Sequence, residues 1–253
     1  MKINKAVITG AGLMAGLLLY GNAYAQDSEP NKWAPANIKI DGQATEWPKP
    51  LQFYNNTTKL FYTIANDKEN IYIIVSVPDA QSQMKIMRSG ITISLNPDGK
   101  KKGGASVTFP LTYNVNTGAP DVPEASRALI AGELKRQLLA NVKEIKVDGF
   151  TGIPDGNIPV QNTFGIQTAS SYDAAGNLVC ELAVPLKVLG INTLSEQPIA
   201  YRFKVNAMKR EDKKELEAKR AKGEHAPMPG EGPDTFALYF SADFWTRQTL
   251  AIH

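Results

Sequence analysis

Apolar and polar residues alternate along most of the chain after residue 50, with the period of two that is typical of β-strands. In YRFKVN the alternation is complete, with Tyr201, Phe203 and Val205 on one face and polar residues on the other. The alternating runs are TKLFYTIAN, NIYIIVSVPD, GITISLN, ASVTFP, TFGIQTA, NLVCELAVP, IAYRFKVNA and DTFALYF. Many short strands separated by turn residues predict an all-β, mostly antiparallel β-sandwich of the immunoglobulin-like or jelly-roll type.

Two segments break this alternation. Residues 122–140 place apolar side chains at helical spacing, so we expect one added α-helix that packs this stripe on the protein's own core. Residues 208–232 begin with MKREDKKELEAKRAK and continue as a loop rich in proline and glycine. We expect a charged, solvated excursion between two strands there. A partner-binding role is the alternative for both segments.

The first 25 residues have the features of a secretion signal. Lys2 and Lys5 precede an apolar run to about Tyr20, and Ala-Tyr-Ala at 23–25 matches a small-x-small cleavage site. We therefore expect an exported protein, periplasmic or extracellular, whose mature chain is a single domain over 26–253. No other apolar run approaches membrane-spanning length.

This assignment predicts that exported material begins at or near Gln26. N-terminal sequencing measures this directly, and an intact Met1 on the exported protein would contradict it.

Charge and composition argue against several classes of function. Removal of the leader's two lysines lowers the formal net charge from +3 to +1, which gives no field suited to nucleic acid. The chain has one cysteine, Cys180, expected to be a small buried hydrophobe, and two histidines, His225 and His253, in a loop and at the terminus. Histidine-dependent triads and multi-histidine metal sites are therefore disfavoured.

No catalytic constellation can be identified, so an enzyme is the weaker hypothesis. A hydrolase would need a carboxylate pair, and the acids set closest to strands are Asp79 and Glu181, the latter on the face opposite Cys180. No organic cofactor is indicated. Calcium is the one metal ion considered, because acids at strand ends can supply oxygen ligands; the candidates are Asp67, Asp79 and Asp98.

The order of several short motifs resembles the family 9 carbohydrate-binding modules and their DOMON-like relatives. The matching residues are Asp41, Gly42 and Trp47, then Asp67, Ile71 and Tyr72, then Asp79, and finally Glu181, Val184 and Pro185. The resemblance spans about 38–241 and implies the same sandwich fold. It also implies that Trp47, with Asp41 and Gly42, is a structural plug and that other aromatic residues grip the sugar.

The two regions that match the family's sugar clamp lack aromatic residues. They read DAQSQMKIMRSG and EHAPMPGEGPD. The leading hypothesis is nevertheless a secreted, non-catalytic domain that binds a polysaccharide or oligosaccharide during its uptake or breakdown. The alternatives are a structural or accessory partner in an envelope complex, a domain associated with a glycoside hydrolase, and a DOMON-type apolar-ligand binder. A haem-binding version would have to rely on methionine ligands such as Met84 or Met87.

Any glycan contacts should come from aromatic residues outside the clamp positions. Those beside turn-rich segments have the best chance of exposure, and they are Trp33, Tyr54, Tyr113 and Trp245. Trp245 is expected beyond the last strand, DTFALYF, with Arg247 and Gln248 nearby to meet sugar hydroxyls. The alternative for Trp245 is that it packs the chain end onto the sandwich.

Overall fold

A computed structural model describes residues 29–112, 124–192, 195–209, 218, 221–223 and 235–252. For 124–131 and 235–236 only the backbone is described. The expected leader, most of the charged excursion, Tyr113 and both histidines lie outside these residues.

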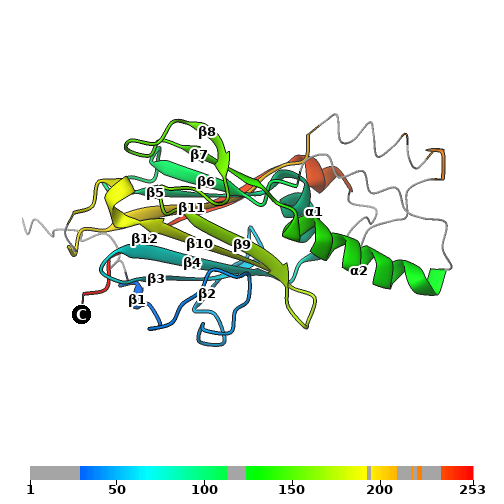
Figure 1. The fold of residues 1–253 in the computed structure, drawn as a ribbon, viewed down its shortest axis with the longest axis horizontal. Helices are drawn as coiled ribbons and strands as arrows, with labels where there is room; N and C mark the ends of the chain where they lie inside the picture. The colour runs from blue at the N-terminus through cyan, green and yellow to red at the C-terminus, as the bar shows by residue number, and fades with distance from the viewer. Residues whose placement is uncertain are drawn as a thin grey trace, which may run out of the picture.

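The described strands form two six-stranded sheets that stack face to face (Figure 1). The first sheet has the order β1-β3-β4-β10-β9, and β2 also pairs with β3. Its strands are β1 (Lys32–Trp33), β2 (Phe53–Asn55), β3 (Leu60–Asn66), β4 (Asn70–Val77), β9 (Gln167–Tyr172) and β10 (Leu178–Pro185). Within it, β1 runs parallel to β3, and the other neighbours are antiparallel.

The second sheet has the order β12-β11-β5-β6-β7-β8 and is antiparallel throughout. Its strands are β5 (Ile91–Asn96), β6 (Ala105–Phe109), β7 (Glu144–Asp148), β8 (Gly156–Pro159), β11 (Ile199–Val205) and β12 (Ala242–Gln248). The predicted β-sandwich is confirmed.

The core between the sheets is built from the apolar face of each alternating strand. Tyr62 of the first sheet contacts Phe203 and Phe244 of the second, with ring centroids 4.7 and 5.2 Å away. Cys180 is fully buried in the same core, beside Leu178 and Leu182 on its strand face. Because these side chains point inward, their neighbours in each strand point away from the core.

The helix expected over 122–140 is present as α2 (Glu124–Ala140), which packs near β9. A second helix, α1 (Ala80–Ser89), was not predicted. Asp79 caps its start by accepting a hydrogen bond from the Ser82 N–H at 2.8 Å, and Gly90, with a φ of 73°, ends it. This helix occupies the first of the two regions that match the family's sugar clamp.

The prediction for the chain end was wrong in one respect. The apolar run DTFALYF is not the last strand, because Thr235–Tyr239 forms the 3₁₀ helix η2. The last strand is β12, so Trp245 lies within a strand and not beyond it. A further 3₁₀ helix, η1 (Leu186–Leu189), follows β10.

Among the described residues, no helix has the length and apolar character needed to cross a membrane.

Candidate functional site

Residues 34–52 cover part of the outer face of the first sheet, and we call them the cover segment. Trp47 anchors this segment and is only 3% exposed. It belongs to a small apolar cluster, separate from the main core, made with Ala34, Ala65, Tyr72, Ile74, Val179 and Ala183. Trp47 is therefore a packing element on the sheet and is not open to a ligand.

A buried carboxylate bonds to the cover segment at the same place. Glu181 of β10 is fully buried and accepts three hydrogen bonds. Its Oε1 accepts from the Trp47 Nε1–H at 2.7 Å, and its Oε2 accepts from the N–H groups of Gly42 and Asp41 at 2.8 and 3.1 Å. Burial raises the pKa of Glu181 to about 7, although the three donated bonds act in the opposite direction.

Gly42 is required at this contact. Its φ of 82° lies in the left-handed region, and a Cβ there would come within 2.9 Å of the backbone between Ser170 and Ser171. The Ser171 hydroxyl donates to the Gly42 carbonyl at 2.7 Å, which closes the cover segment onto β9. The Asp-Gly turn, Trp47 and Glu181 thus act as one structural unit.

An aromatic pair lies on the outer face of the first sheet, at its β2 edge. Tyr54 and Phe61 face each other across β2 and β3, with ring centroids 4.6 Å apart and planes tilted by 42°. Tyr54 is 49% exposed and Phe61 is 37% exposed. Their strand neighbours Phe53 and Tyr62 contact each other on the core side, which fixes the outward direction of the pair.

Polar groups of the β2–β3 turn lie beside this pair. The Lys59 ammonium donates to Asn56 Oδ1 at 2.6 Å, and both side chains are exposed. Asn55 Oδ1 holds the turn by accepting from the N–H groups of Thr57 and Thr58. The turn that joins the two ring-bearing strands therefore presents an amide and an ammonium to solvent.

Trp245 lies on the outer face of the second sheet. Its ring is half-buried, and the Arg202 guanidinium carbon lies 5.8 Å from the ring centroid. Arg202 also pairs with Asp243, with 2.8 Å between Nε and Oδ2. The expectation that Gln248 would meet a sugar hydroxyl fails, because this side chain is 2% exposed.

The described aromatic candidates do not converge on one site. Tyr54 and Trp245 lie on the outer faces of different sheets. Trp33 is half-buried in β1, five residues along β3 from the Tyr54 partner Phe61. Phe61 was missed by sequence reasoning, although the alternation that turns Leu60 and Tyr62 inward already indicated its outward position.

Each of the three calcium candidates already forms a hydrogen bond or an ion pair with a residue close to it in the sequence. Asp67 accepts from the N–H groups of Glu69 and Asn70 and from the Tyr72 hydroxyl, Asp79 caps α1, and Asp98 pairs with Lys100 at 3.0 Å. In the part of the chain that the structure describes, no three histidine, cysteine or acidic side chains cluster as metal ligands would.

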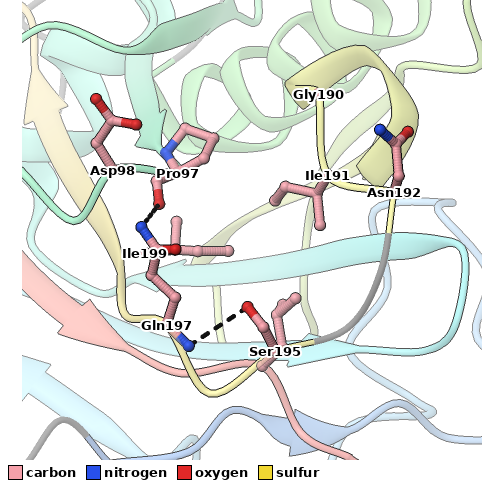
Figure 2. A pocket seen from close by; sticks show the side chains of 9 residues that line it. Pro97, Asp98, Gly190, Ile191, Asn192, Ser195, Gln197 and Ile199 are labelled. Atoms are coloured by element: carbon pink, nitrogen blue, oxygen red, sulfur yellow. Dashed lines mark hydrogen bonds between the residues drawn. The ribbon is translucent and has the colours of Figure 1, made fainter.

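A hollow of about 240 Å³ lies at the end of the sandwich opposite α1 (Figure 2). Its lining includes Asp98, Asn192, Ser195 and Gln197, together with Ile191 and Ile199. Gln197 donates through Nε2 to the Pro97 carbonyl at 3.3 Å and through its backbone N–H to the Ser195 hydroxyl at 3.4 Å (Figure 2). None of the predicted site aromatics is among its described lining residues.

The methionines considered as haem ligands are both buried in α1. Met87 is 4% exposed and belongs to the main core, whereas Met84 is 3% exposed and packs with Met208 and Leu238. Both thioethers therefore serve as packing groups.

No protein-family model matches the chain, and no curated protein sequence matches it either. A solved structure of a family 9 carbohydrate-binding module from Caldicellulosiruptor kristjanssonii, in complex with cellotriose, is similar in part. The alignment covers 72% of this chain and 79% of the module, with 9% identity and a TM-score of 0.35. At this level of similarity no residue role transfers between the two proteins.

Proposed function

We propose that this protein is an exported, non-catalytic carbohydrate-binding domain and that Tyr54 and Phe61 form its sugar-stacking surface. The observation that carries the proposal is the pairing of two exposed rings on one face of a sheet. Covering these rings with the apolar face of a ligand would remove their surface from water, which is favourable.

The chemistry of the neighbouring groups suits a saccharide. An aromatic face packs against the C–H groups of a sugar ring, and a small number of polar groups then fix the hydroxyls. The exposed side chains of Asn56 and Lys59 are donors and acceptors of this kind, at the turn that leads from one ring to the other. Both rings stand on paired strands, so binding would cost little ordering of the protein.

Replacement of either ring should weaken glycan binding without unfolding the protein. We expect Tyr54→Ala and Phe61→Ala each to lower affinity about tenfold or more, since truncation of an aromatic hot spot costs about 2 kcal/mol or more. Loss of the cross-strand contact should cost only about 0.2–1 kcal/mol of stability. A glycan array identifies a retained glycan, and calorimetric titration of that glycan measures the effect.

Phe240→Ala is the matched control, because Phe240 is an aromatic side chain with 55% exposure at another place on the chain. It should leave glycan affinity unchanged. The aromatic pair is not a sugar site if the wild type retains no glycan. It is also not a sugar site if Tyr54→Ala and Phe61→Ala bind the glycan as tightly as the wild type and Phe240→Ala do. The accessory-protein hypothesis would then take its place.

A further inference from the structure

Two basic side chains lie close together on the outer face of the second sheet. Arg202 and Lys204 are two residues apart in β11, roughly 7 Å along the strand, and both are half-buried. Asp243 of β12 lies directly across from Lys204 and accepts the Arg202 Nε–H bond. Lys204 forms no ion pair with any described residue. One carboxylate therefore stands beside two cations.

Arg202 is held in place with part of its donor capacity free. Asp243 accepts from its Nε, and its guanidinium carbon lies over the Trp245 ring, 5.8 Å from the centroid. The two terminal nitrogens donate no hydrogen bond to any residue that the structure describes. A guanidinium offers several donors in a fixed fork that matches a carboxylate, and here that fork is already oriented before any ligand arrives.

The side chains across from these cations on β5 are small and polar. Ser94 lies opposite Arg202 on β5, and Thr92 lies opposite Lys204. The other acids on the strands of this face, Glu144 and Asp148, belong to β7, three strands from β11. At about 4.8 Å per strand this is about 14 Å, well beyond the roughly 8 Å over which salt screens exposed charges. Among the described strand residues of this face, the charges close to β11 are thus two positive, Arg202 and Lys204, and one negative, Asp243.

From this arrangement we infer that the β11–β12 half of the outer face binds a saccharide that carries carboxylates, with Arg202 and Lys204 on the acid groups and Trp245 as the neighbouring apolar contact. The inference rests on the proposed function in that the ligand is a glycan. This acid-binding site lies on the outer face of the second sheet, whereas Tyr54 and Phe61 lie on the outer face of the first, so the two sites can be tested separately.

The test uses one polymer in two charge states. The purified protein is titrated with an oligogalacturonate and with the same oligosaccharide after methyl esterification of its carboxyl groups. The acidic form should bind about tenfold or more tightly than the ester, and its affinity should fall as salt is raised. Arg202→Gln and Lys204→Gln should each weaken binding of the acidic form about tenfold and leave binding of the ester unchanged.

Lys146→Gln is the matched control, because Lys146 is an exposed lysine of β7 on the same face. It should leave both affinities unchanged. Equal binding of the two forms, no binding of the acidic form, or an equal loss in Lys146→Gln and Lys204→Gln would overturn the inference. If Arg202→Gln fails to fold, Lys204→Gln decides alone, since Lys204 loses no ion pair with any residue that the structure describes.

Tyr54→Ala separates this inference from the proposed function. Normal acid-specific binding in Tyr54→Ala, together with an unchanged glycan array, leaves the β11–β12 site standing and removes the aromatic pair. The opposite outcome is that Tyr54→Ala loses neutral-glycan binding while the wild type binds the acid and the ester with equal affinity. That outcome keeps the aromatic pair and removes the β11–β12 site.

Discussion

A Trp47→Ala protein is expected to unfold with a free energy about 3–5 kcal/mol below that of the wild type, the usual cost of removing a buried aromatic side chain. Trp47 is 3% exposed and fills the space between the cover segment and the outer face of the first sheet. Its removal also leaves Glu181 Oε1 without the 2.7 Å bond that it accepts. Thermal and denaturant unfolding measure the loss, which should lower the melting temperature by on the order of 10 °C.

Two variants separate the loss of packing from the loss of the hydrogen bond to Glu181. Trp47→Phe retains most of the packing and loses only the Nε1–H donor, so it should cost less than Trp47→Ala. Trp33→Ala removes a tryptophan that is only half-buried at the sheet edge and should also cost less. If Trp47→Ala melts like the wild type but loses a ligand, Trp47 is a binding platform and the structural assignment is wrong.

The strands that sequence reasoning identified are those with one strongly apolar face. β3, β4, β5, β10 and β11 all show that pattern, and each was expected where it lies. The missed strand β12 lacks it, whereas β7 shows it in Ile145 and Val147 and was missed nonetheless. β12 turns Thr246 and Gln248 inward beside Phe244, so its core face reads as polar, whereas the apolar run before it forms a 3₁₀ helix.

The helix α1 was missed because its apolar residues are few and clustered. Its boundaries were nevertheless visible, since Asp79 is a typical N-cap residue and Gly90 a typical C-terminal stop. Alternation within a strand and capping at a helix end depend on neighbouring residues alone, so both can be found in the sequence, whereas pairings such as β4 with β10 join residues about a hundred positions apart.

The role of Glu181 is not local and could not be found that way. The alternation placed this carboxylate on the face opposite Cys180, where a solvated or hydrogen-bonded acid at the strand end was the ordinary interpretation. Burial of that face depends on the cover segment, more than 120 residues earlier in the chain. One signal was available: the run LVCELAVP is nearly continuous in apolar residues, as expected for a strand buried on both sides, and all eight of its residues are buried.

Glu181 is expected to make the protein less stable as the pH rises from about 4.5 to about 7. Its ordinary pKa is 4.5, and burial raises the pKa in the folded protein to about 7. Over that interval the folded protein therefore holds a proton that the unfolded chain has released. The stability is fully present below pH 4.5 and is lost as the pH passes through about 7. The free energy of unfolding should fall by on the order of 3 kcal/mol.

Urea unfolding between pH 4 and pH 8, in the wild type and in Glu181→Gln, isolates this effect. An amide does not titrate, so the pH-dependent difference between the two proteins reports Glu181 alone and cancels the histidines. Glu144→Gln, at an exposed glutamate of β7, is the matched control and should follow the wild type. A difference that grows in the opposite direction, with the wild type gaining stability as the pH rises, would mean that the three donated bonds outweigh burial. Glu181 would then hold the cover segment as a permanently ionised group.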